Sequence, residues 1–298
     1  MTRIVLALLV ATTALSAQEP PAAKRNDGKN ASGGKILPEQ AAYDVLHYDL
    51  ALSVFPEKRE IEGTVTVTAR ILSPIRYLIL DLADPLRVKK ASSGDRGLSF
   101  QQKNGMISID LGAKAEKDQV IKVSVRYGEK PRVAPNAPWD GGVTWKKTPS
   151  GAHWIATTCQ GEGADLWWPC KDHPSDKSEA MDIRITIPEE LFCASNGKLK
   201  SNQKNGDGTR TVHWRLDTPI GNYNVALNIA PYTMITEEFT SVTGEKVPVA
   251  FYVLPESVEK AKKAGIDSVE WRPGEGGPGR KYYQLTQSGL AEAQREAR

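Results

Sequence analysis

Cysteine is scarce in this chain, with three residues among 298: Cys159, Cys170 and Cys193. So few cysteines exclude a disulfide-dense mini-protein. They permit one disulfide at most, and the alternative is three small buried apolar side chains. The interval between Cys159 and Cys170 has no C-x-x-C character, which argues against a structural zinc site.

Charge imbalance and long apolar runs are also missing. The 39 basic and 36 acidic residues leave a formal net charge of +3. This near balance gives no reason to expect a nucleic-acid partner or a polybasic membrane anchor. Beyond the amino terminus no uncharged apolar stretch approaches the ~20 residues that span a bilayer, so we expect no membrane span.

The amino terminus has the features of a secretory signal. Arg3 provides a short positive region, and the residues from Ile4 to Ser16 are apolar or small. Residues 1–17 are therefore predicted to be a signal peptide, which implies a secreted or periplasmic protein. The alternative is a buried N-terminal helix. Residues 18–39 are rich in Pro, Ala, Gly and Lys and are predicted to be a flexible leader.

Apolar residues alternate with polar ones through most of the chain, which predicts strands. One face collects Leu46, Tyr48, Leu50, Leu52 and Val54, and after a turn at 56–59 another collects Ile61, Gly63, Val65, Val67, Ala69 and Ile71. A period of two predicts a half-buried antiparallel pair. Similar runs occur at 77–82, 98–102, 106–111, 121–127, 181–187, 222–239 and 247–253. Regular strands without alternating helices predict an all-β sandwich of mostly antiparallel strands.

The segment 131–180 breaks this pattern. It holds five of the seven tryptophans, namely Trp139, Trp145, Trp154, Trp167 and Trp168. They are expected either to pack a corner of the core or to floor a cleft into which Gln160, Glu162 and Asp165 point. Composition does not choose between the two.

Several separated motifs resemble one family in sequence and spacing. They are YDVLHYDLALSVFPEKREIEGTVTVTARIL, APWDGGVTWKK, TTCQGEGADLWWPCKDHPSDKSEAMDIRITIP, LFCASNGKL and TPIGNYNVALNIAPY. Residues 40–264 thereby resemble the N-terminal domain of the zinc aminopeptidases of the aminopeptidase N family, which includes the leukotriene hydrolases. The resemblance implies a saddle-shaped β-sandwich that caps a thermolysin-like catalytic domain.

One site residue follows from the resemblance. In a T-x-C-E/Q stretch of the family, the residue after Cys helps to hold the free amino terminus of the substrate, and this position is Gln160. The resemblance also implies an unusual backbone at this loop, in some members a cis peptide after that residue. The alternative is a polar loop residue without a role. Glu162 lines the same loop and is expected to be able to approach a substrate, Asp172 to order the following turn, and His173 to be exposed.

The zinc site of the family does not occur in these 298 residues. Family members use H-E-x-x-H with a downstream Glu ligand, but His47, His153, His173 and His213 are each followed by other residues. We therefore expect a truncated family member that binds no zinc and is inactive alone. Its expected partners are the surface of the missing catalytic domain and a peptide amino terminus. Binding of the amino terminus is expected to be latent without that domain. The other hypothesis is a non-catalytic secreted β-sandwich that binds a peptide or a protein.

The final residues, 265–298, do not continue the resemblance. A VEW sequence, a Gly- and Pro-rich loop and RKYYQLTQSG resemble the wing of PadR-type winged-helix repressors. A helix is expected at 255–264 and a short α/hairpin tail after it. The recognition helix has no counterpart, so we expect no DNA binding. The tail is interpreted as a gene rearrangement, a frameshift or an assembly artefact, or as a hairpin-forming tail without such ancestry.

Overall fold

The structure, a computed structural model, describes residues 35–240, 244–263, 269–274 and 277–283. The expected signal peptide (1–17) and all but the end of the expected leader (18–39) lie outside these residues. Strands dominate the described chain. The helices are short: α1 (Pro38–Ala41), η1 (Ala164–Leu166), η2 (Asn222–Asn224), η3 (Pro255–Ser257) and α2 (Val258–Lys263). The predicted all-β class is confirmed, and none of the described helices is long and apolar enough to cross a membrane.

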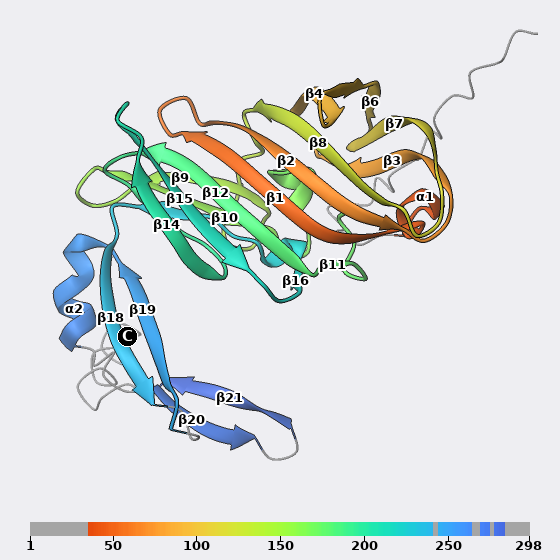
Figure 1. The fold of residues 1–298 in the computed structure, drawn as a ribbon. Coiled ribbons are helices and arrows are strands. Elements are labelled where there is room, and N and C mark those ends of the chain that lie inside the picture. The colour runs from red at the N-terminus through yellow and green to blue at the C-terminus, as the bar shows by residue number, and fades with distance from the viewer. Residues whose placement is uncertain (1–34, 241–243, 264–268, 275–276, 284–298) are drawn as a thin grey trace, which may run out of the picture.

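One layer of the fold is an eight-stranded sheet in the order β14-β15-β12-β1-β2-β8-β4-β5 (Figure 1). Its strands are β1 (Tyr43–Phe55), β2 (Glu60–Ile71), β4 (Arg87–Ser93), β5 (Arg96–Leu98), β8 (Val120–Glu129), β12 (Ala180–Pro188), β14 (Lys198–Lys204) and β15 (Thr209–Leu216). Only the β1–β12 pairing in this sheet is parallel.

Smaller sheets cover the apolar face of the large one. They have the orders β13-β17-β10-β9 and β3-β7-β6, and a short β11–β16 pair adds to them. Their strands are β3 (Ile75–Asp81), β6 (Phe100–Lys103), β7 (Met106–Ala115), β9 (Gly142–Lys147), β10 (His153–Thr158), β11 (Lys177–Ser178), β13 (Phe192–Ala194), β16 (Ile220–Gly221) and β17 (Asn228–Ala230). The expected sandwich therefore has one continuous sheet and a divided second layer.

The first hairpin shows how the alternating pattern builds the sheet. Leu50 pairs with Val65 in register, and both side chains are buried. The prediction that Leu46 shares this buried face is wrong. A register shift between Val45 and His47 changes the phase of β1, so Val45 is buried and Leu46 is only half-buried. Such a bulge places an extra residue in one strand and reverses which side chains face inward.

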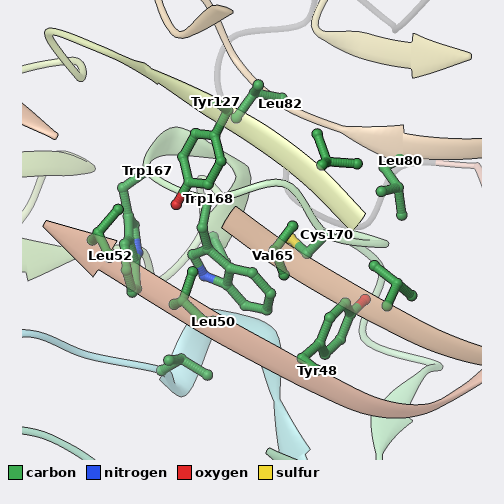
Figure 2. Close-up of a cluster of buried hydrophobic side chains, with 14 of the residues drawn as sticks. Tyr48, Leu50, Leu52, Val65, Leu80, Leu82, Tyr127, Trp167, Trp168 and Cys170 are labelled. Atoms are coloured by element: carbon green, nitrogen blue, oxygen red, sulfur yellow. The ribbon is translucent and has the colours of Figure 1, made fainter. Parts of the chain in front are cut away.

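The core between the layers contains the two adjacent tryptophans. Trp167 and Trp168 are almost completely buried, and the ring of Trp168 meets Tyr48 edge-on with centroids 4.9 Å apart. Figure 2 shows Trp168 between Leu50 of β1 and Tyr127 of β8. Buried aromatic rings are among the largest contributors to a hydrophobic core, so the segment 159–172 is anchored on the large sheet.

A second hairpin, β18 (Thr233–Thr240) and β19 (Lys246–Val253), extends away from the sandwich (Figure 1). Its base is held by Tyr252, whose ring stacks on Phe192 at 5.1 Å. The helix expected at 255–264 is observed as η3 followed by α2. Within the predicted tail, β20 (Val269–Gly274) and β21 (Gly277–Tyr283) form a hairpin, and the other tail residues lie outside the described chain. The resemblance of the tail to a PadR-type wing stays a prediction.

Candidate functional site

The segment after β10 forms a tight turn that carries Gln160 at its tip. The backbone N–H groups of Glu162 and Gly163 both donate to the carbonyl of Cys159, at 3.1 and 2.8 Å. Gly161 has a φ of +81°, the value that the third residue of a type II turn requires and that glycine adopts without a Cβ clash. The turn is thus fixed by its own backbone bonds and by glycine at the strained position.

The side chain of Gln160 is exposed and makes no hydrogen bond to another described residue. The cis peptide that the resemblance implies for some members of the family is not observed after Gln160: within the described chain the cis bonds are Asp84–Pro85 and Ala137–Pro138, so the Gln160–Gly161 bond is trans. The unusual backbone of this loop lies instead in the positive φ of Gly161.

The side chain of Glu162, which the sequence analysis expects to be able to approach a substrate, is turned into the protein. Its side chain is 8% exposed, and its carboxylate lies 2.6 Å from the guanidinium of Arg132. The other carboxylate oxygen accepts the N–H of Gly141 at 2.7 Å. Sequence reasoning missed this pairing because Arg132 and Glu162 are 30 positions apart, and only the fold brings them together.

The residues that follow the turn are structural. Asp172 accepts the N–H of Ala164 at 3.1 Å and donates its own N–H to Asp81 at 2.9 Å, so it joins this segment to η1 and to the end of β3. Lys171 is 5% exposed; its ammonium contacts Asp176 at 2.6 Å and donates to the carbonyl of Tyr43 at 2.6 Å. A buried charge with paired partners keeps a loop in one arrangement.

Two of the five tryptophans of this segment follow the first of the two expectations, which is packing in the core. Trp167 and Trp168 pack the core, as the first account predicts. Trp145 and Trp154 are half-buried. Trp139 is 80% exposed, and it precedes Gly141, the residue bonded to Glu162, by two positions. An exposed indole therefore stands on the segment that is tied to the Gln160 turn.

The match to one family decides what this fold is. The sequence model of the Peptidase M1 N-terminal domain matches residues 45–223. The chain belongs to this family. Human glutamyl aminopeptidase is 23% identical over 233 residues, which make up 74% of this chain and 23% of that protein. The bovine glutamyl aminopeptidase is 22% identical over an equal length. The chain spans about a quarter of the length of these relatives.

Solved structures show the same fold as this M1 domain. The M1 zinc metallopeptidase of Deinococcus radiodurans has a TM-score of 0.62 and 22% sequence identity, over 75% of this chain and 52% of that one. A mutant of that enzyme bound to a Tyr-Ser-Ala substrate has a TM-score of 0.61 over the same shares. The predicted membership of the aminopeptidase family and the predicted fold are thereby confirmed.

Zinc is the cofactor of M1 peptidases, but the described part of this chain offers no group of three His, Cys, Asp or Glu side chains placed to hold a metal ion. The cysteines are free and buried. Burial raises the pKa of Cys159 and Cys193 to about 12 and that of Cys170 well above its usual range. The three cysteines are therefore neutral thiols at physiological pH, as the packed alternative predicts.

The histidines contact carboxylates or hydroxyls instead. His47 and His213 both bond to Asp182, at 2.9 and 2.7 Å, and Arg215 approaches the same carboxylate at 2.5 Å. His173 is half-buried and bonds to Ser175 at 2.6 Å. The prediction that His173 is exposed is therefore only partly met. The Asp182 cluster lies across β1, β12 and β15, and the sequence could have indicated it only through the register of these strands.

Proposed function

We propose that this chain provides the substrate-positioning N-terminal domain of an M1 zinc aminopeptidase and that Gln160 contacts the free amino terminus of a peptide. One observation carries the proposal: the Gln160 amide is exposed, has no partner among the residues that the structure describes, and stands on a turn that is held by backbone bonds. A peptide ammonium has three donors and needs oxygen acceptors, and the Gln160 carbonyl supplies one. Because the backbone of the turn is already held by its own bonds, binding has to order only the Gln160 side chain.

The proposed activity is removal of N-terminal amino acids from peptides. It is assigned to this domain together with a zinc catalytic domain, because the 298 residues contain no H-E-x-x-H. Docking on such a domain is part of the proposal. Export through residues 1–17 is proposed as well, on the signal-like sequence.

The test is an enzyme in which residues 35–263 are fused to the zinc domain of the Deinococcus radiodurans metallopeptidase. Tyr-Ser-Ala is the substrate, and kcat/KM is the measurement. Gln160→Ala removes a bond to a charged group, which is worth roughly 1–3 kcal/mol. We therefore expect a fall in kcat/KM of roughly 5- to 150-fold.

Two further variants sharpen the test. Gln160→Glu offers a charged acceptor, so it is expected to preserve or raise kcat/KM for peptides with a free amino terminus. Gln203→Ala changes a different exposed glutamine, which lies on β14, and is expected to leave kcat/KM unchanged. An unchanged kcat/KM for Gln160→Ala would remove this residue from the site.

A second function is favoured by the exposed Trp139. An indole that is 80% exposed on a folded loop is typical of contact residues for a protein or peptide partner. The alternative to the enzyme domain is therefore a non-catalytic secreted β-sandwich that binds such a partner through Trp139. In the fusion enzyme, a loss of activity with Gln160→Ala but not with Trp139→Ala favours the aminopeptidase function.

A further inference from the structure

Glu162 joins two loops that are remote in sequence. One of its oxygens accepts the Gly141 N–H at 2.7 Å, and the other lies 2.6 Å from Arg132. Its side chain is 8% exposed. Burying a carboxylate is costly unless it is paired and hydrogen-bonded, and here both oxygens have partners.

The loop that receives Glu162 is itself firmly placed. The carbonyl of Arg132 accepts the N–H of Val143 at 2.8 Å, which ties this arginine to the start of β9. At Gly141 the two loops approach so closely that a Cβ would lie 2.6 Å from Leu166 and 2.8 Å from the Cβ of Glu162. Only glycine fits at position 141 when Glu162 lies this close. The contact between the two loops therefore depends on both Gly141 and Glu162.

Glu162 is also the last residue of the turn that carries Gln160. Its N–H donates to Cys159 within the turn, while its side chain holds the neighbouring loop. The backbone bonds from Glu162 and Gly163 to Cys159 shape the turn. The carboxylate adds a bond from the turn to Gly141, in the loop that precedes β9.

We propose that Glu162, paired with Arg132, is a positioning residue that fixes the placement of Gln160 for the peptide amino terminus. The inference rests on the proposed function of Gln160. Glu162 touches no substrate in this scheme; it acts through the turn.

Hydrogen exchange on the full chain tests whether Glu162 fixes the turn. Glu162→Ala removes the acceptor of the Gly141 amide, so exchange at that amide is expected to accelerate roughly 10-fold or more. Exchange at the amide of Gly163 is expected to accelerate as well. The amide of Thr157 in β10, which donates to Leu227, is the internal reference and is expected to keep its rate.

Matched variants separate the contributions. Glu162→Gln keeps an acceptor for Gly141 but loses the charge that pairs with Arg132, so its effect should be intermediate; it also serves if Glu162→Ala does not fold. Glu62→Ala is the control, because Glu62 likewise pairs with an arginine, Arg126, but on another strand. It is expected to leave the turn amides unchanged. The proposal is overturned if the Gly141 and Gly163 amides exchange as slowly in Glu162→Ala as in the wild type, or in Glu162→Gln where Glu162→Ala does not fold.

Nuclear magnetic resonance of the same proteins tests the link to Gln160. Millimolar Tyr-Ser-Ala is expected to shift the side-chain amide signal of Gln160, and the N-acetylated peptide is not. In Glu162→Ala the peptide concentration at half-shift is expected to rise at least ~5-fold. If the wild type and Glu162→Ala reach half of the shift at the same peptide concentration, Glu162 is not a positioning residue, while Gln160 still contacts the peptide. No shift in the wild type refutes the proposed function of Gln160 itself.

Discussion

Replacing Asp182 by asparagine is expected to destabilise the sandwich in a pH-dependent way. Burial alone would raise the pKa of Asp182, but hydrogen bonds from His213, Arg215 and His47 outweigh it and hold the pKa at about 2. The side chain is 10% exposed, so solvent screens these contacts little. A pKa below the ordinary value near 3.8 means that folding favours the ionised carboxylate.

The magnitude follows from that difference. One pKa unit corresponds to ~1.4 kcal/mol, so the ionised Asp182 contributes on the order of 2 kcal/mol to the free energy of unfolding. For a carboxyl whose pKa is lowered by folding, this contribution is fully present above the unfolded pKa of ~3.9. It is lost as the pH falls toward 2. Asp182→Asn should therefore differ most from the wild type above pH ~5, and the two should converge near pH 2.

Urea unfolding followed by tryptophan fluorescence at pH 6, 4, 3 and 2.5 measures this difference at constant ionic strength. Asp95→Asn changes an exposed carboxylate in the turn between β4 and β5 and is the control. A difference between wild type and Asp182→Asn that stays constant from pH 6 to pH 2.5 would refute the electrostatic reasoning. It would indicate a packing effect instead.

Three further results are expected. Trp168→Ala opens a cavity beneath β1 and should lower the free energy of unfolding by roughly 3–5 kcal/mol in urea titrations; a loss below 1 kcal/mol would mean that the core collapses around it. Trp139→Ala removes an exposed ring and should change stability by less than about 0.5 kcal/mol in the same assay, whereas a larger loss would show a packing role. Cys159 and Cys193, whose pKa values burial raises to about 12, should react with a thiol reagent at pH 8 only in urea; rapid labelling of the native protein would contradict their burial.

The sequence was sufficient for the fold class and for most strands. The alternation through β2 predicts the burial that is observed, because period-two burial is a local property. The phase of β1 around Leu46 was not predictable in this way. A bulge depends on the partner strand, and alternation in one strand does not reveal it.

The candidate site was predictable in part. Gln160 was identified by resemblance, and its exposure agrees with that prediction. The pairing of Glu162 with Arg132 could not be inferred, since a glutamate between two glycines has the composition of an exposed loop. Its burial depends on the approach of residues 131–142, which is a tertiary contact.

The parallel pairing of β1 with β12 has a consequence for how the chain is made. His47 aligns with Ala180 and Ser53 with Thr186, so the middle of the large sheet joins segments more than 130 residues apart. During synthesis, β1 and β2 emerge from the ribosome long before β12. Until then one edge of β1 presents unpaired backbone groups, and such an edge can pair with another chain. Chaperone binding to nascent chains should therefore persist until residue 188 has emerged.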